Sequence, residues 1–436
     1  MQADCIILGA GAAGLAAACA LSGSGLRVAL VERQERVGKK LLATGNGRCN
    51  LSNADMTPEH YGEAAPFVRR VYEATPPSEV LAFFDRLGLM LCEEEGRLYP
   101  RTRMAASVLD VLRAGCDGVT LLTGREAVSL APSRRGGLSV QLADGEGLFA
   151  PAVLAAMGGS AAPHLGTDGS GTRLLEALGH TVTPLFPALV QLKCAHSALR
   201  SLKGLRVQAA LTLEIDGAPA AREEGELLFA DYGVSGVCVF QLSGLAARAL
   251  SRRSAVRLLV NLLPEVPEDE LSAWLDRRID LHPDATAQAL FSGVLPRLLA
   301  QAVLRQAGVS AETPASTLSF RERLSLLGAL SIFPLEVTGT QGMKQAQVTA
   351  GGVSLEEVDP QTMRSRCFDS LYLTGELLDV DGPCGGYNLH FAFASALTAV
   401  KAIRAQYGLC APFGQKGSPC FAFTTSSSRS RIRRRP

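Results

Sequence analysis

The first 32 residues constrain this chain more than any other segment. Cys5–Leu8 is a short apolar run, long enough for a buried strand, and it leads directly into a Gly-x-Gly-x-x-Gly motif that starts at Gly9. The alanine- and leucine-rich stretch Ala12–Leu21 predicts a helix, and Arg27–Val31 predicts a second strand that ends at Glu32. Strand, glycines, helix, strand and acid in this order predict a βαβ unit that binds a dinucleotide.

Each conspicuous residue of this unit has a physical role in such a site. Gly9 permits the tight turn out of the strand, Gly11 lets the backbone approach a pyrophosphate, and Gly14 lets helix and strand pack closely. The helix N-terminus offers free N–H groups and a partial positive charge to the phosphates. The carboxylate of Glu32 can accept hydrogen bonds from ribose hydroxyls.

Composition limits the other classes of protein that the chain could belong to. Its 436 residues, 47% apolar and 19% charged, suit a soluble protein of two or three domains, and no apolar run is long enough to cross a membrane. A signal peptide is disfavoured because no basic segment precedes the apolar run and Asp4 interrupts it. The eleven cysteines include no Cys-x-x-Cys pair, so we expect reduced thiols, a cytoplasmic location and no metal.

The net charge of +1 is unevenly distributed along the chain. Residues 413–436 contain six lysines or arginines and no acid, so the rest of the chain is net negative and does not resemble a nucleic-acid binder. We expect residues 411–436 to form a disordered, solvated basic tail, with contact to RNA or to a membrane surface as the alternative.

A second dense segment follows the βαβ unit. Residues 33–53 are rich in glycine, basic residues and amides, and such a loop can offer backbone N–H groups and cations to an anionic cofactor. Two later segments end an apolar strand in a glycine turn, at Gly158-Gly159 and at Gly375-Glu376. Glycine at these points allows close approach of the backbone to a ligand.

The sequence GKKLLATGNGRCNLSN at 38–53 resembles the flavin-contacting loop of the BaiN-like NAD(P)/FAD-dependent oxidoreductases, a family that includes enzymes described as aminoacetone-oxidase-like. The stretch 375–389 resembles the closing FAD motif of the same family, and the resemblance spans the chain except its tail. It implies an FAD site built from both ends of the chain. Motif and resemblance together predict that the cofactor contacts Gly9, Gly11, Ala13, Gly14, Glu32, Arg33, Lys39, Lys40, Thr44, Gly45, Asn46, Gly47, Arg48, Cys49, Asn50, Val128, Gly158, Gly159, Gly375, Glu376, Asp381, Gly385, Gly386, Tyr387, Asn388 and Leu389.

Apolar periodicity and turn residues predict the remaining elements. Ser78 is the expected N-cap of one helix, Gly96–Pro100 is expected to be a break between elements, and Asp216-Gly217 is expected to be a hairpin turn. Helices are expected at 67–74, 78–87, 105–114, 172–178, 268–281, 285–306, 321–330 and 390–405. Strands are expected at 119–122, 126–130, 137–142, 152–156, 189–192, 207–215, 226–229, 256–262, 347–353 and 370–374.

The expected fold class is α/β. It comprises a Rossmann-like, glutathione-reductase-like FAD-binding domain, interrupted by a β-rich domain with a helical subdomain. The FAD-binding domain would consist of residues 1–187 and 346–410, and the insert would span 188–345 with its helical part near 264–330. The resemblance implies that this insert covers the flavin and shapes the substrate cavity.

The resemblance also implies a function. We expect an FAD-dependent oxidoreductase that takes hydride from NAD(P)H, bound transiently because a second Rossmann motif is missing, and reduces a small organic substrate. The candidate reaction is reduction of a conjugated C=C bond, as in 3-oxo bile acids. The proton donor that it requires could be Tyr232, Asp231 or Tyr387, among which the sequence does not choose, and no catalytic residue is assigned.

Other interpretations remain. An RNA-modifying flavoprotein is supported only by the basic tail, and a flavin-binding protein without turnover fits the same motifs. Cys49 and Cys384 are expected to pack or to position backbone, and the helix start at 166–171 fits an anion site and an ordinary N-cap equally well. A hydrolase is disfavoured because the Gly-x-Ser-x-Gly pattern is absent at Gly233–Val237. We expect no nucleic-acid partner, and the sequence does not indicate the oligomeric state.

Overall fold

A computed structural model describes residues 1–267 and 269–409, and its first organising element is a parallel sheet. The strand order is β19-β10-β1-β2-β6, and the three central strands are buried along their whole length. Strands buried on both faces need continuous apolar sequence, which these segments have. The strands are β1 (Cys5–Leu8), β2 (Val28–Val31), β6 (Thr120–Leu122), β10 (Ala152–Ala155) and β19 (Leu371–Leu373).

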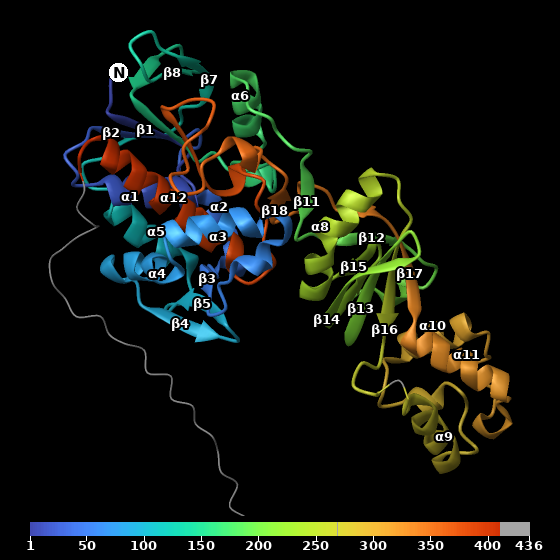
Figure 1. Cartoon of the computed structure of the whole chain (residues 1–436). Coiled ribbons are helices and arrows are strands. Elements are labelled where there is room, and N and C mark those ends of the chain that lie inside the picture. The colour runs from blue at the N-terminus through green and yellow to red at the C-terminus, as the bar shows by residue number, and fades with distance from the viewer. Residues whose placement is uncertain (268, 410–436) are drawn as a thin grey trace, which may run out of the picture.

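Two helices pack together against this sheet, one from each end of the chain (Figure 1). The helix α1 (Ala12–Leu21) is buried on nearly all sides, and its alanines let the neighbouring backbone approach closely. The helix α12 (Tyr387–Gln406) packs on it and buries Phe391 and Phe393. Four more helices complete this part: α3 (Ala65–Ala74), α4 (Pro77–Arg86), α5 (Ala105–Ala114) and α6 (Ser170–Leu178), and the short α2 (Lys39–Ala43) follows β2.

Two small antiparallel sheets flank the parallel one. The first has the order β3-β5-β4, with β3 (Ser52–Asn53), β4 (Leu91–Glu94) and β5 (Arg97–Pro100). The second is a meander of β7 (Ala127–Pro132), β8 (Leu138–Leu142) and β9 (Gly147–Ala150). Short 3-10 helices lie at Thr44–Gly47, Pro58–Ala64, Pro163–Leu165, Ala289–Phe291, Ala315–Thr317, Leu355–Glu357 and Gly375–Leu377.

The insert is a closed six-stranded barrel with a hydrophobic core of its own. The hairpin turn predicted at Asp216-Gly217 is confirmed, with φ of 51° and 83° at its two residues. The strands are β12 (Leu192–Ala195), β13 (Arg206–Ile215), β14 (Ala218–Ala230), β15 (Gly233–Ser235), β16 (Val256–Asn261) and β17 (Phe333–Thr340), and a short helix α7 covers Leu199–Leu202. The helix α8 (Val237–Ser251) packs against the barrel strands β14, β17 and β13.

The helical part of the insert lies at the end farthest from the parallel sheet (Figure 1). It contains α9 (Leu271–Leu281), α10 (Arg297–Ala307) and α11 (Phe320–Ser331). The single helix predicted at 285–306 is wrong, because Gly293 has φ of 77° and Pro296 precedes the first residue of α10. Only the second half of this range is α-helical, and the first half contains a short 3-10 helix at Ala289–Phe291.

A two-stranded ribbon joins the two parts, where β11 (Phe186–Ala188) pairs antiparallel with β18 (Val348–Ala350). The predicted strand 189–192 is wrong, because Leu189 has φ of 50° and separates β11 from β12. The fold class, a Rossmann-type domain with a β-rich and partly helical insert, is confirmed. The proposed boundaries at 188 and 345 fall beside this ribbon and stay proposals.

Other local expectations need correction. Gly96–Pro100 is mostly strand β5 rather than a break. Ser78 is not the N-cap of α4, since Pro76 holds that position and Pro77 is the first helical residue, where a missing N–H costs nothing. The closing helix begins three residues before His390. The predicted tail at 411–436 lies outside the described residues, and none of the described helices is long and apolar enough to span a membrane.

The separate cores predict separate unfolding signals. Leu211 is fully buried in the barrel core, so Leu211→Ala should destabilise the insert by about 2–5 kcal/mol. The chain's single tryptophan, Trp274 of α9, reports on the insert by its fluorescence. We expect the tryptophan transition to move to lower temperature while cofactor release moves less. The exposed Leu245→Ala is the control, and equal shifts of both signals in Leu211→Ala would contradict separate cores.

Candidate functional site

A cleft opens at the carboxyl edge of the parallel sheet, where ligands bind in open α/β sheets. Segments from both ends of the chain form it. The residues that line it are Gly9, Ala10, Gly11, Ala12, Ala13, Glu32, Gln34, Arg36, Gly38, Lys39, Lys40, Leu41, Thr44, Ala156, Met157, Gly158, Leu165, Gly166, Thr167, Gln347, Val348, Thr374, Gly375, Glu376, Val380, Asn388, Leu389, Phe391 and Ala392.

The three glycines of the first turn have different surroundings. A Cβ on Gly9 would lie 2.6 Å from the carbonyl oxygen of Ala156, and one on Gly14 would lie 1.8 Å from that of Gly9. Both positions therefore need glycine for packing within the protein. A Cβ on Gly11 would meet no protein atom within 4 Å, and Gly11 precedes α1 without a side-chain cap. The open space beside free N–H groups fits a pyrophosphate.

Glu32 is fixed at the end of β2 by the backbone. One carboxylate oxygen accepts from the N–H of Ala10 at 2.7 Å, and the other from the N–H of Gln34 at 2.8 Å. The carboxylate thus lines the cleft in a set orientation, with lone pairs left for hydroxyl donors. This is the geometry expected of a ribose-binding acid.

The opposite wall of the cleft is built around Glu376. Lys40 Nζ lies 2.7 Å from one carboxylate oxygen of Glu376, and the N–H of Thr349 donates to the other at 2.8 Å. Both charged side chains are about one-fifth exposed. One carboxylate therefore connects the helix α2 to the turn after β19 and to the strand β18.

The start of α12 forms the far end of the cleft. Gly386 precedes the helix in the left-handed region, with φ of 98°, and no side chain caps it. Asn388 fixes the preceding loop, since its side chain donates to the carbonyl of Gly382 and accepts from the N–H of Gly382 at 2.8 and 2.9 Å. An uncapped helix start directed at the cleft can stabilise negative charge on a ligand.

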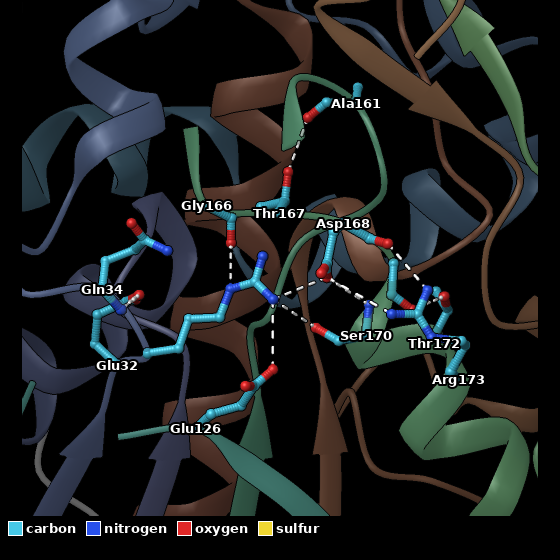
Figure 2. Close-up of polar contacts among 12 residues, drawn as sticks. Glu32, Gln34, Glu126, Ala161, Gly166, Thr167, Asp168, Ser170, Thr172 and Arg173 are labelled. Atoms are coloured by element: carbon cyan, nitrogen blue, oxygen red, sulfur yellow. Dashed lines mark hydrogen bonds and ion pairs between the residues drawn. The ribbon is translucent and has the colours of Figure 1, made fainter. Parts of the chain in front are cut away.

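Arg33 does not line the cleft but contacts a neighbouring loop. Figure 2 shows Gly166, Asp168 and Ser170 of that loop. The guanidinium of Arg33 donates to the carbonyl of Gly166 at 2.9 Å and lies 2.9 Å from Asp168 and 3.5 Å from Glu126. Burial opposes the charge of Asp168, but Arg33 and Ser170 outweigh it and lower the pKa of Asp168 to about 2. Arg33 thus positions the loop 163–170, whose residues Leu165, Gly166 and Thr167 line the cleft.

Twelve of the predicted contact residues line the cleft, and fourteen lie outside its lining. The twelve are Gly9, Gly11, Ala13, Glu32, Lys39, Lys40, Thr44, Gly158, Gly375, Glu376, Asn388 and Leu389. The fourteen are Gly14, Arg33, Gly45, Asn46, Gly47, Arg48, Cys49, Asn50, Val128, Gly159, Asp381, Gly385, Gly386 and Tyr387, whose contact with a cofactor stays a prediction.

Several of these outlying residues have other partners in the structure. Val128 is half exposed on β7, and Gly159 packs against Thr349, where a Cβ would lie 2.4 Å from the hydroxyl. Gly386 packs on the carbonyl of Ser52, and the backbone carbonyl of Tyr387 accepts from a buried tyrosine hydroxyl. Close packing against other protein atoms is enough to explain why positions 159 and 386 are glycine.

Asp381 and Cys384 join the closing loop to the insert. Arg248 of α8 lies 3.0 Å from Asp381, and the side chain of Gln241 of α8 accepts from the N–H of Cys384 at 2.7 Å. Burial raises the pKa of Asp381 and Arg248 opposes it. The helix α8, which the sequence analysis did not predict, is thus the part of the insert that touches the closing loop.

His390, in the first turn of α12, is fully buried. Burial lowers its pKa to about 3, so the ring is neutral. Nδ1 lies 2.8 Å from the hydroxyl of Ser52, and Nε2 has no hydrogen-bond partner among the described residues. The ring therefore packs the helix start on β3 and adds no charge there.

One group of potential metal ligands occurs in the described part of the chain: His180, Glu357 and Cys367. Both ring nitrogens of His180 already have partners, Glu357 at 2.7 Å and the hydroxyl of Ser365 at 3.1 Å. These bonds tie the segment after α6 to the loop before β19, so the group has a structural explanation without a metal.

Comparison with known proteins decides the family. The model of the HI0933-like protein Rossmann domain matches residues 3–402. The chain belongs to the HI0933-like family. The resemblance to BaiN-like enzymes is confirmed, and the chain is an FAD-dependent oxidoreductase with a Rossmann-type FAD-binding domain.

Two curated relatives cover nearly the whole chain. A 3-dehydro-bile acid delta(4,6)-reductase from Clostridium scindens is 39% identical over 401 residues, which are 91% of this chain and 98% of the relative. A ribosomal RNA dihydrouridine synthase from Escherichia coli K12 is 30% identical over 400 residues, 90% of this chain and 96% of the relative. Among solved structures, a 3-ketosteroid delta1-dehydrogenase from Sterolibacterium denitrificans shares the fold, with a TM-score of 0.50, 13% identity and coverage of 93% and 100%.

The residues of the cleft fit FAD. The open space at Gly11 would receive the pyrophosphate, Glu32 would face the ribose, and the uncapped start of α12 would lie at the ring end. The lining residues that sequence reasoning missed are Ala10, Ala12, Gln34, Arg36, Gly38, Leu41, Ala156, Met157, Leu165, Gly166, Thr167, Gln347, Val348, Thr374, Val380, Phe391 and Ala392. Most of these are apolar or glycine neighbours of predicted residues, and only their place at the strand ends could have indicated them.

The glycine surroundings give a matched pair of variants. Gly11→Ala adds a methyl group into space that holds no protein atom, so the fold should survive while FAD binding weakens about tenfold or more. Gly328 of α11 also has open space around it, so Gly328→Ala is the control. FAD dissociation constants and melting temperatures measure both effects. Unchanged FAD affinity in Gly11→Ala would remove the pyrophosphate from this position.

The Arg33–Asp168 pair predicts a pH dependence. The pKa of Asp168 lies below its ordinary value of 3.8, so the pair stabilises the folded protein above about pH 4 and loses its effect as the pH falls towards 2. The stability difference between the native protein and Asp168→Asn should therefore be constant from pH 7 to 4 and shrink below. Denaturant midpoints across this range measure it, and a difference that persists at pH 2 would contradict the assignment.

Proposed function

We propose that this flavoenzyme reduces a C=C bond conjugated to a carbonyl group, with a 3-oxo steroid acid as the substrate type. The observation that carries the proposal is the 39% identity to the 3-dehydro-bile acid delta(4,6)-reductase over 91% of this chain. The uncapped start of α12 at the cleft supports the proposal, because free N–H groups there can stabilise negative charge on a reduced flavin.

FAD, when bound and in its reduced form, would supply a hydride to a carbon of the substrate. The chain's own residues do the rest. The Lys40–Glu376 pair joins the two ends of the chain at the site, and the two Asn388–Gly382 hydrogen bonds fix the loop before α12. The start of α12 presents free N–H groups where negative charge develops on reduction.

A proton must join the hydride for the C=C bond to become CH–CH, and we propose Glu223 of β14 as its donor. Burial raises the pKa of Glu223, which keeps a proton on the carboxyl group at higher pH. Glu223 lies directly opposite Leu211 in the barrel, so its side chain shares a face with Gly225, where a Cβ would lie 3.8 Å from the Cβ of Cys238 in the first turn of α8. Gln241 of the same helix accepts a hydrogen bond from the closing loop at Cys384. Glu223 would face the ring site from the insert.

The earlier candidates suit this role less well. Asp231 is exposed and pairs with Lys203 at 2.6 Å, which lowers the pKa of Asp231 and leaves it ionised. The pKa values of Tyr232 and Tyr387 are raised by burial, so both keep their protons near neutral pH. The ring of Tyr387 packs against Gly385 and His60 rather than lining the cleft.

The experiment that tests this function separates reduction from reoxidation. The purified holoenzyme is mixed anaerobically with NADH and with NADPH, and bleaching of the flavin band shows which nucleotide reduces it. We propose NAD(P)H as this donor. A 3-oxo-Δ4 steroid acid should then restore the band faster than buffer. If no enone accelerates reoxidation, reduction of a steroid enone is excluded.

The proton donor has its own test. Glu223→Gln should slow reoxidation by the enone about tenfold or more and leave reduction by NAD(P)H within twofold of the native rate, since only the oxidative step needs the proton. Glu224→Gln, the exposed neighbour on β14, is the matched control. Equal reoxidation rates in the two variants would show that Glu223 is not the donor.

A second candidate is reduction of uracil in ribosomal RNA, favoured by the 30% identity to the dihydrouridine synthase. That reaction also saturates a C=C bond beside a carbonyl, so the same flavin chemistry serves it. The described helical part of the insert has more acids than bases, which disfavours a phosphate-binding surface there. Faster reoxidation by rRNA than by any enone would favour this candidate.

A further inference from the structure

One face of the sheet β3-β5-β4 gathers arginines beside the flavin site. In the register of the sheet, Arg97 lies directly opposite Asn53 on one neighbouring strand and directly opposite Glu94 on the other. Residues directly opposite in an antiparallel sheet point to the same face, and Tyr99 follows Arg97 by two positions on that face. Glu93 pairs with Leu98 and belongs to the opposite face.

Two further arginines reach this face from adjoining loops. The guanidinium of Arg48 lies 4.3 Å from the ring centre of Tyr99, and that of Arg103 lies 5.4 Å from it. Both also pair with the carboxylate of Glu94, Arg48 at 2.6 Å. A single carboxylate therefore balances two guanidinium groups.

Arg97 adds a third positive charge that nothing on this face balances. No acid within the described ranges forms an ion pair with Arg97, and its side chain is partly exposed. We call Arg48, Arg97 and Arg103 the arginine face. With Glu94 as its one acid, the face has surplus positive charge, and Arg97 keeps its planar set of donors available.

The arginine face adjoins the end of the cleft where α12 begins. The side chain of Asn53, directly opposite Arg97, donates to the carbonyl of Gly385 at 2.9 Å. A substrate whose reacting ring lies at the start of α12 can therefore extend towards Arg97.

We propose that the arginine face binds the carboxylate of the substrate, at the end of the molecule remote from the ring that is reduced, with Arg97 as the residue that selects an acid over a neutral analogue. This inference rests on the proposed function for the type of substrate. A guanidinium can take a carboxylate through two parallel hydrogen bonds, which gives both affinity and orientation. The guanidinium groups of Arg48 and Arg103 already contact Tyr99 and Glu94, so these two arginines contribute positive electrostatic potential rather than direct hydrogen bonds to the substrate.

The test uses binding rather than turnover. A 3-oxo-Δ4 bile acid and its methyl ester are titrated into the oxidised holoenzyme without reductant, with calorimetry as the readout. The native protein should bind the acid about tenfold or more tightly than the ester. Arg97→Gln should remove that preference and leave ester affinity unchanged, and Arg97→Lys should restore part of it.

The matched control is Arg113→Gln, an exposed arginine in the last turn of α5. It should keep the native preference, and FAD content and melting temperature verify that each variant is folded. The inference is overturned if the native protein binds ester and acid equally, if neither ligand binds below 1 mM as an order-of-magnitude limit, or if Arg97→Gln keeps the preference. A retained preference for the acid with no reoxidation by either compound would refute enone reduction and leave the anion site standing.

Discussion

The ion pair between Lys40 and Glu376 is the contact on which the site depends. These residues are 336 positions apart, yet Nζ and carboxylate lie 2.7 Å apart and are mostly shielded from water. The second oxygen of Glu376 binds the backbone of β18 at Thr349, so three segments meet at one carboxylate. Removing either charge would leave the other partly buried and unpaired, which is costly. The chain can carry a large insert because this contact, with the parallel pairing of β10 and β19, fixes both ends of the flavin domain.

Much of the fold could be predicted, because local sequence and tertiary structure agree there. The first strand and helix have the predicted bounds, since an apolar run, glycines and alanines all favour the same βαβ unit. The helix α8 was missed because its first residues, Val237, Cys238 and Val239, favour a strand locally. Packing between the barrel and the closing loop overrides that preference. The helix expected at 285–306 failed for the opposite reason, since its apolar spacing hid the break at Gly293 and Pro296.

The candidate site could be predicted in part. Residues of the glycine turns and Glu32 line the cleft, because their chemistry and their place after strands are both visible in the sequence. Arg33 was predicted to contact the cofactor, and that stays a prediction; the ion pair of its guanidinium with Asp168, more than 130 positions away, had no local signal. The arginine face was not predictable, since Arg48, Arg97 and Arg103 meet only through the register of β3, β5 and β4. Non-local pairing of this kind leaves no local signal.

The central claim is that one FAD site is assembled from both ends of this chain. The measurement that tests it most directly is the flavin content of the purified native protein, released by denaturation and identified by chromatography. The account predicts one FAD per chain, and loss of most of it in Glu376→Gln, which breaks the contact between the two ends while the fold persists. FMN in place of FAD, no flavin at all, or full FAD content in Glu376→Gln would contradict it.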